Sequence, residues 1–246
     1  MKQFLFNYTV TELKEWFQQE GIRPFHANQL LEWLYVKKTS TFPEMTNLGV
    51  ALREKLTQSF EIQSITLVRI QESDDKETFK FLWKLACGRL VESVLILSNE
   101  RRTVCVSSQV GCPARCAFCA SGQKGFFRNL DCHEIISQIY LIDQWLAKKG
   151  ERVSHVVYMG MGEPLRNYEA VTKSIRMLID PQMMHLSQRR ITVSTVGVVE
   201  GILRFSTEDF RVNLVLSLHA PNQRIRQKII PYAREYGLDD IMKAMD

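Results

Sequence analysis

The chain has 246 residues, enough for one or two domains, and 45% of them are hydrophobic while 24% are charged. This composition is that of a globular protein and excludes disordered, collagen-like and fibrous classes. No apolar run approaches the roughly 18 residues of a membrane span, and no signal-peptide pattern develops at the N-terminus. We therefore expect a cytoplasmic protein with no membrane partner. The net charge of +5 suits an RNA or phosphate partner without requiring one, and the oligomeric state stays open.

The first 62 residues carry a helical pattern. Thr9 and Glu12 have the spacing of a capping box, and the apolar residues that follow lie three and four apart, which predicts a helix. Similar patterns predict helices over 25–36 and 48–60. Residues 1–62 are therefore expected to form a helical N-terminal module.

Further along the chain, the pattern changes to strands and then to alternating strands and helices. Alternating apolar residues between 64 and 97 predict three short strands, which form a small connector over 63–98. After that, strands are expected at 103–107, 155–159, 190–194 and 212–217, with helices at 132–149, 168–179 and 198–205. This alternation is typical of parallel βα units, so the predicted fold class is α/β.

The last predicted region, residues 99–246, has too few βα units to close an eightfold barrel, which takes about 250 residues. We expect an incomplete (β/α) partial barrel. An amphipathic pattern begins near residue 239 and stops at Asp246. This ending predicts a C-terminal truncation.

Four of the six cysteines fall within residues 105–119. In a protein that is not secreted, such clustering indicates metal binding or thiol chemistry instead of a disulfide scaffold. Three of them form a C-x3-C-x2-C motif that places three thiolates in one loop: Cys112, Cys116 and Cys119. On the cysteines alone, a zinc loop with Cys132 or His133 as the fourth ligand is an alternative, and it implies a zinc-stabilised RNA-binding module without catalysis.

This motif resembles that of the radical S-adenosylmethionine (SAM) superfamily, in which three cysteines hold a [4Fe–4S] cluster and the open iron binds SAM. Three further segments follow in order: GMGEP at 160–164, ITVST at 191–195 and LSLHAP at 216–221. Together the motifs resemble the bacterial methyltransferases that modify carbon 2 of an adenine in 23S rRNA, at the peptidyl transferase centre, and of an adenine next to the anticodon in tRNA. A related enzyme methylates carbon 8 of the same rRNA adenine. Pro164 after Glu163 favours carbon 2.

The resemblance implies roles for individual residues. Cys112, Cys116 and Cys119 would be the cluster ligands. SAM would be bound by residues at the predicted strand ends, namely Gly162, Glu163, Ser194, Ser217, Leu218 and His219. A strand-end carboxylate such as Glu163 suits the cationic amino group of methionine. Cys105 would be the resolving thiol and Glu92 the general base, although the spacing of Glu92 by itself is that of a partly exposed sheet residue.

The resemblance also implies a methyl-cysteine mechanism. One SAM methylates a cysteine, and a 5'-deoxyadenosyl radical from a second SAM abstracts hydrogen from that methyl group, so that the carbon radical adds to the adenine. Cys105 then forms a transient disulfide that releases the product. The electron comes from an external donor such as flavodoxin. In the family the methyl-carrying cysteine and a SAM-binding asparagine lie beyond the position of Asp246, so these 246 residues alone are not expected to complete turnover.

Basic residues gather around the cysteine motif. Residues 101–130 contain no acidic residue, and aromatic Phe118, Phe126 and Phe127 alternate with five cations: Arg101, Arg102, Arg115, Lys124 and Arg128. This pattern predicts a rim that faces RNA, and a solvated basic face is the alternative. A second basic group has the same two interpretations and consists of Arg224, Arg226 and Lys228.

Overall fold

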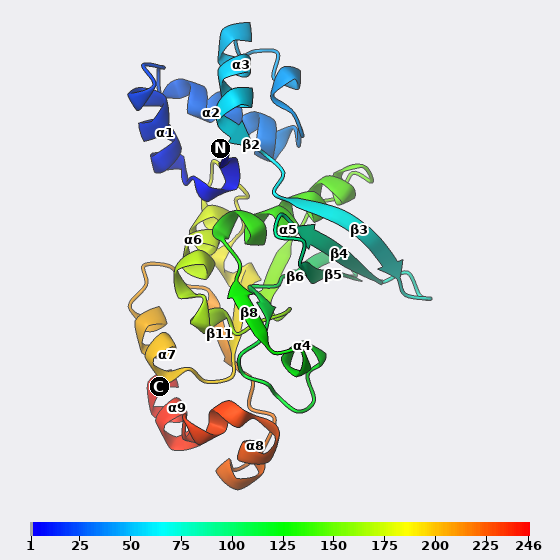
Figure 1. Cartoon of the computed structure of the whole chain (residues 1–246), viewed down its shortest axis with the longest axis vertical. Helices are drawn as coiled ribbons and strands as arrows, with labels where there is room; N and C mark the ends of the chain where they lie inside the picture. The colour runs from blue at the N-terminus through cyan, green and yellow to red at the C-terminus, as the bar shows by residue number, and fades with distance from the viewer. Residues whose placement is uncertain (1) are drawn as a thin grey trace.

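The structure is a computed structural model that describes residues 2–246. Its centre is a mixed sheet of seven strands in the order β11-β10-β9-β6-β5-β4-β3 (Figure 1). The three strands of this sheet that come first in the sequence form an antiparallel meander: β3 (Ile65–Glu72), β4 (Thr78–Leu85) and β5 (Leu90–Ser98). The other four are parallel to one another: β6 (Arg101–Cys105), β9 (His155–Tyr158), β10 (Ile191–Thr195) and β11 (Asn213–Leu216).

The N-terminal module is helical, as predicted, and forms the upper end of the molecule in Figure 1. It contains α1 (Val10–Gln19), α2 (Phe25–Leu31), which continues as a π-helical turn, and α3 (Val50–Ser59). The capping box forms, because the Thr9 N–H donates to the Glu12 carboxylate at 2.7 Å and the Glu12 N–H to the Thr9 hydroxyl at 3.3 Å. The short strands β1 (Gln3–Phe4) and β2 (Phe60–Glu61) pair in parallel and join the two ends of the module.

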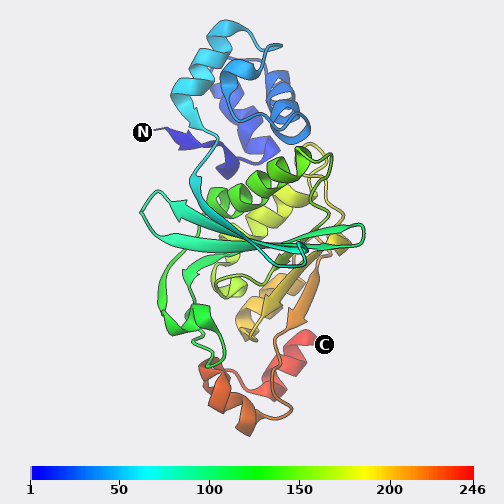
Figure 2. The same cartoon turned by 90° about the vertical axis from the view of Figure 1, so that its right-hand side faces the viewer.

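The predicted alternation of strands and helices is present. Helices α5 (Cys132–Ala147), α6 (Tyr168–Ile179) and α7 (Val199–Ser206) connect the parallel strands. After β11, α8 (Gln223–Ile229) and α9 (Leu238–Met245) occupy the end of the molecule opposite the N-terminal module (Figure 2). No helix among residues 2–246 combines the length and apolar character needed to cross a bilayer.

One small unit was not predicted. Strands β7 (Gln109–Gly111) and β8 (Phe126–Asn129) form an antiparallel pair, and the chain between them carries the cysteine loop and α4 (Ala120–Gln123). The three residues of β7 are all buried. A strand this short and uniformly buried has no alternation that a sequence pattern can reveal.

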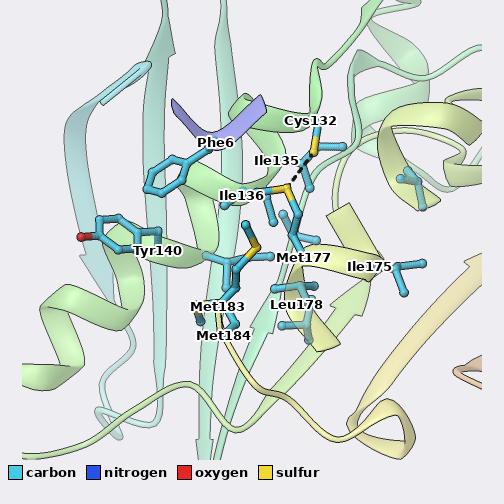
Figure 3. Close-up of a cluster of buried hydrophobic side chains, with 14 of the residues drawn as sticks. Phe6, Cys132, Ile135, Ile136, Tyr140, Ile175, Met177, Leu178, Met183 and Met184 are labelled. Atoms are coloured by element: carbon cyan, nitrogen blue, oxygen red, sulfur yellow. Dashed lines mark hydrogen bonds between the residues drawn. The ribbon is translucent and has the colours of Figure 1, made fainter. Parts of the chain in front are cut away.

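Helix α5 forms the centre of the core. Twelve of its sixteen residues are buried. Figure 3 shows Ile136 of α5 between Phe6 of the N-terminal module and Met177 of α6, with Tyr140 of α5 beside Phe6. The Phe6 and Tyr140 ring centroids lie 4.7 Å apart. This helix therefore joins the module to the α/β core.

Polar contacts fix the N-terminal module to the same helix. The Tyr140 hydroxyl donates to the Thr39 carbonyl at 2.7 Å, and the Asn7 side chain accepts from the His133 N–H at 3.0 Å. Lys38 forms an ion pair with Asp143, whose side chain is 2% exposed. These contacts are buried or partly buried, so the module and the core are packed as one body.

The strands of the predicted connector continue the sheet of the core. Five residue pairs join β5 to β6 in antiparallel register across residue 98. A loop after β2 leads directly into β3, which lies at the edge of the sheet. The division of the chain at residues 62 and 98 stays a prediction.

Candidate functional site

One face of the sheet is covered by helices and the other carries the predicted catalytic residues. In β6, β9 and β10 alternate residues are buried, including Val104, Val156 and Val193, while their neighbours are half-buried. Paired residues in neighbouring strands point to the same face. Cys105 pairs with Val94 of β5 and with Val157 of β9, and Glu92 lies two residues before Val94. Glu92 and Cys105 therefore share the open face.

The Glu92 carboxylate lies at the edge of a cavity of about 580 Å³. It is 3.2 Å from the Lys80 ammonium and 42% exposed, which agrees with a partly exposed sheet residue. The same cavity is bordered by Gly111 before the cysteine loop and by Met161 of the GMGEP turn. The structure thus places Glu92 beside the predicted cluster and SAM motifs.

Cys105 is the last residue of β6 and is half-buried. Burial raises the pKa of its thiol to about 11. At neutral pH the thiol is therefore protonated and a weak nucleophile, because thiolate is the reactive form.

The cysteine loop is shaped by its backbone. Gly111 has φ of 77°, and a Cβ there would lie 1.8 Å from the Gly125 carbonyl oxygen, so only glycine fits. The Cys112 N–H donates to that carbonyl at 3.1 Å, and the Ala117 N–H donates to the Ile229 carbonyl at 2.8 Å. The second bond ties the loop to the end of α8, which lies about a hundred residues later in the chain.

The three thiols of the loop lie within electrostatic range of one another. Burial, and after it the charges of Glu163, Cys116 and Cys119, raise the pKa of Cys112 to about 11. The pKa of Cys116 is also raised, first by burial and then by Cys119. Among residues 2–246, no three His, Cys, Asp or Glu side chains converge closely enough to hold a single metal ion.

The GMGEP turn packs tightly against the segment after β6. A Cβ at Gly160 would lie 2.7 Å from the Val106 carbonyl oxygen, and one at Gly162, where φ is 112°, would lie 2.7 Å from the Ser108 hydroxyl. Side chains at either position would push this turn away from the sheet. The GMGEP turn can therefore lie this close to the segment after β6 only because Gly160 and Gly162 have no Cβ atom.

Glu163 connects two of the predicted SAM-binding turns. Its side chain is 2% exposed and accepts from the Val196 N–H at 2.8 Å and from the Leu165 N–H at 3.1 Å. Burial raises the pKa of this carboxyl to about 6. Its two oxygens thus join the turn after β9 to the turn after β10.

The third predicted turn reaches the cysteine loop. The Ser194 and Ser217 hydroxyls lie 2.7 Å apart, and Leu218 is 41% exposed. The His219 ring contacts Phe118, with centroids 4.5 Å apart. The structure thus brings His219, in the predicted SAM-binding turn after β11, next to the cysteine motif.

Arg226 lies inside the protein, so its prediction as a surface residue is wrong. It is 0% exposed, its Nε donates to the Leu218 carbonyl at 3.1 Å, and one Nη donates to the Val196 carbonyl at 2.5 Å. The seven-residue helix α8 turns this side chain inward, whereas Arg224 and Lys228 are exposed. An inward arginine in a short helix leaves no sequence signal, which is why it was missed.

The predicted basic rim is only partly formed. Arg102 makes two 2.6 Å contacts with Glu151 at the amino end of β6, and Arg128 makes two 2.7 Å contacts with Glu134. Arg101 lies beside Arg102, at the opposite end of β6 from Cys105.

The cations that remain near the cysteine loop are Arg115 and Lys124, and Lys124 borders the Glu92 cavity. Arg89, which sequence patterns did not indicate, adds to them by stacking 3.8 Å from the Phe127 ring centroid. Phe118, Phe126 and Phe127 are 53%, 44% and 50% exposed. These six residues form what we call the loop rim.

Neither proposed fourth zinc ligand lies at the cysteine loop. The Cys132 sulfur is 3.6 Å from the Met177 sulfur in the main core (Figure 3), and the His133 ring stacks on Phe4 with centroids 4.1 Å apart. Cys112 and Cys116 belong to a separate small cluster with Ala114, Ile230 and Ala233. The structure therefore gives no support to a four-ligand zinc loop.

Comparisons with known proteins identify relatives along the whole chain. Residues 4–62 match the ribosomal RNA large subunit methyltransferase N-terminal domain, and residues 106–246 match the radical SAM superfamily. A probable dual-specificity RNA methyltransferase RlmN 2 of Protochlamydia amoebophila is 63% identical over 96% of this chain and 66% of its own length. The corresponding RlmN protein of Caldicellulosiruptor saccharolyticus is 41% identical over 100% of this chain and 70% of its own.

A crystal structure of a radical SAM methyltransferase from Sphaerobacter thermophilus matches with a TM-score of 0.95 and 38% identity, covering 98% of this chain and 71% of that one. This match confirms the predicted α/β fold with its radical SAM core. The chain spans just under two thirds of the length of the first curated relatives, 66% and 64%.

The residues of the site fit the cofactors of the superfamily, which are a [4Fe–4S] cluster and SAM. Three thiols in one loop are the donors that iron–sulfur clusters take. Each thiolate of such a cluster binds a different iron, so the sulfurs need not converge as they do around one zinc ion. A buried nitrogen of Arg226 has no hydrogen-bond partner, and its guanidinium lies in electrostatic range of Cys116, so these surroundings would suit an anionic cluster at the three thiols. From these motifs, matches and geometry, the chain belongs to the radical SAM superfamily and, within it, to the RlmN family.

Proposed function

We propose that this chain carries the catalytic core of a cytoplasmic enzyme that methylates carbon 2 of an adenine in 23S rRNA and of an adenine in tRNA. The observation that carries the proposal is the meeting of three motifs at one edge of the sheet. The cysteine loop, the GMGEP turn and the SLHAP turn surround the open face that bears Glu92 and Cys105. The relatives are named as dual-specificity RNA methyltransferases, which favours two RNA substrates.

In this proposal Cys112, Cys116 and Cys119 hold the cluster. When bound, the cluster passes one electron from an external donor such as flavodoxin to SAM and thereby supplies the radical chemistry. The chain's own contribution is to hold the loop against α8 and to keep it partly covered, because Cys112 and Cys116 are buried.

The SAM-binding residues have complementary properties. Gly162 and Glu163 supply a tightly packed turn for the methionine end of SAM, and the Ser194 and Ser217 hydroxyls supply polar groups at the carboxyl ends of β10 and β11. Leu218 supplies exposed apolar surface beside His219. The ends of parallel strands are where such folds gather their chemistry.

In this proposal Glu92 would remove a proton from the adenine, and Cys105 would form the disulfide. The half-exposed Glu92 carboxylate is placed to take the proton that the adenine loses, at the border of the cavity. Cys105 would attack the sulfur of the methyl-carrying cysteine, and the new disulfide would release the methylated base. The raised pKa of Cys105 keeps its thiol protonated until that step.

The first experiment tests the radical class. After anaerobic reconstitution, we expect about four irons and four sulfides per chain, and 5'-deoxyadenosine on addition of dithionite and SAM. Cys116→Ala should lose both, whereas Cys132→Ala, in the main core, should retain both. Colourless protein with bound zinc, or equal iron in the two variants, would contradict the proposal.

A second experiment addresses the target atom. RNA methylated by the whole protein is digested to nucleosides and analysed by mass spectrometry against 2-methyladenosine and 8-methyladenosine standards. We expect 2-methyladenosine from both rRNA and tRNA. The 8-methyl nucleoside would favour the carbon-8 alternative, and methylation of rRNA alone would remove tRNA from the proposal.

A further inference from the structure

Arg226 is a buried cation without a buried anion. Its side chain is 0% exposed, and no carboxylate of residues 2–246 lies within 4.0 Å of its guanidinium. One of its terminal nitrogens has no hydrogen-bond partner at all. A buried charge is costly unless it is paired, so such a residue calls for a negative group that is absent from the polypeptide itself.

The surroundings of Arg226 indicate where this negative group belongs. Its other nitrogens donate to main-chain carbonyls of the turns after β10 and β11, those of Val196, Ser217 and Leu218. Two of these carbonyls belong to residues proposed to bind SAM. The guanidinium is also in electrostatic range of Cys116 in the cysteine loop.

We propose that Arg226 is a positioning residue whose charge compensates the [4Fe–4S] cluster and stabilises its reduced state. This inference rests on the proposed function, because it needs the cluster at Cys112, Cys116 and Cys119. The oxidised cluster core carries two positive charges and its three thiolates carry three negative ones, so the bound centre is anionic. The negative charge of this centre would compensate the positive charge of Arg226, which has no anionic partner in the polypeptide.

Reduction makes this compensation stronger. One electron from an external one-electron donor adds one negative charge to the centre, and no bond forms or breaks in that step. A nearby cation in a site of low dielectric favours the more negative state. Arg226 therefore raises the reduction potential of the cluster, and its three carbonyl contacts hold the SAM-binding turns beside it.

The test compares reduction potentials. The chain is reconstituted anaerobically as wild type, Arg226→Gln, Arg226→Lys and the exposed control Arg224→Gln, and each is titrated by electron paramagnetic resonance. We expect Arg226→Gln to lower the ratio of reduced to oxidised cluster at a given potential at least tenfold, a shift of about 59 mV for one electron. Arg226→Lys, which keeps the charge, and Arg224→Gln should stay within threefold of wild type.

The outcomes separate this inference from the proposed function. Equal potentials for wild type and Arg226→Gln, with four irons in each, would overturn the role of Arg226 and leave the function intact. A wild type that binds no four-iron cluster would instead remove the function itself. If Arg226→Gln fails to fold by circular dichroism, Arg226→Lys decides, because a tenfold drop in that folded variant would show that charge is not the cause.

Discussion

At the scale of single residues, the site depends on polar groups whose partners lie in other turns. Glu163 binds the main chain of Val196, and Arg226 binds the carbonyl of the same residue. An acidic side chain thus holds the N–H, and a basic side chain the C=O, of one residue in the turn after β10. Both are buried, so neither can be replaced by solvent without moving the turn.

Glu163 should make stability depend on pH. Its pKa is raised from 4.5 to about 6, so the folded state binds the proton more tightly than the unfolded state. Stability is therefore lost as pH rises through this window, by about 2 kcal/mol. The free energy of unfolding of cluster-free protein is measured by chemical denaturation at pH 4 and at pH 7. Between these pH values the wild type should lose about 2 kcal/mol more than Glu163→Gln does. Glu15→Gln, exposed on α1, is the control, and a difference between wild type and Glu163→Gln that does not change with pH would contradict the prediction.

At the scale of elements, α5 is fastened to the sheet by a buried polar network. The Gln138 amide accepts from the Ser93 hydroxyl at 2.7 Å and from the Ser107 N–H at 3.0 Å, and donates to the Ser107 carbonyl at 3.0 Å. The Ser107 hydroxyl in turn donates to the Glu92 carbonyl and accepts from the Met161 N–H. A core helix therefore supports the strand of the proposed base and the turn of the proposed SAM site.

Breaking this network should destabilise the fold. Gln138→Met keeps most of the side-chain volume but leaves the Ser107 N–H and C=O buried without partners. We expect a loss of about 2–4 kcal/mol in the free energy of unfolding, measured by urea denaturation. Gln19→Met, on the exposed face of α1, should change it by less than about 0.5 kcal/mol. Equal effects of the two substitutions would refute the supporting role of Gln138.

At the scale of the whole molecule, the helical module and the α/β core are packed through α5, and the loop rim lies beside the Glu92 cavity. The rim combines cations with exposed aromatic rings, the combination that binds single-stranded RNA. The arginines that pair with Glu151 and Glu134 are occupied by those partners. We therefore expect RNA to contact the loop rim and not all of the basic residues between 101 and 130.

Substitutions on the rim should change the salt dependence of RNA binding. Arg89→Ala and Lys124→Ala are each expected to weaken binding and to reduce the slope of log K against log salt by about 0.7–0.9 per lost phosphate contact. Arg190→Ala, exposed at the amino end of β10, should leave the slope unchanged. Fluorescence anisotropy with a labelled RNA hairpin at several salt concentrations measures this, and unchanged slopes for the rim variants would reject the surface.

Much of the fold was predictable because its signals are local. The capping box at Thr9, the helix that begins at Cys132 and the alternating strands all follow from spacing within a few residues. The three-cysteine motif and the turn glycines are likewise properties of short segments. Such patterns depend on backbone geometry that repeats every 3.6 or two residues, so they can be read without knowing the rest of the protein.

By itself, then, the sequence determined the elements, the α/β class and the motifs from which a cluster and SAM site were expected. Only the tertiary structure decided that Arg226 is buried, that Arg128 is paired with Glu134 and that Cys132 belongs to the core. It also decided that Phe118 meets His219, a hundred residues away. The physical reason is that burial and pairing depend on strand register and on which side of each helix packs inward, and these are set by contacts between distant segments.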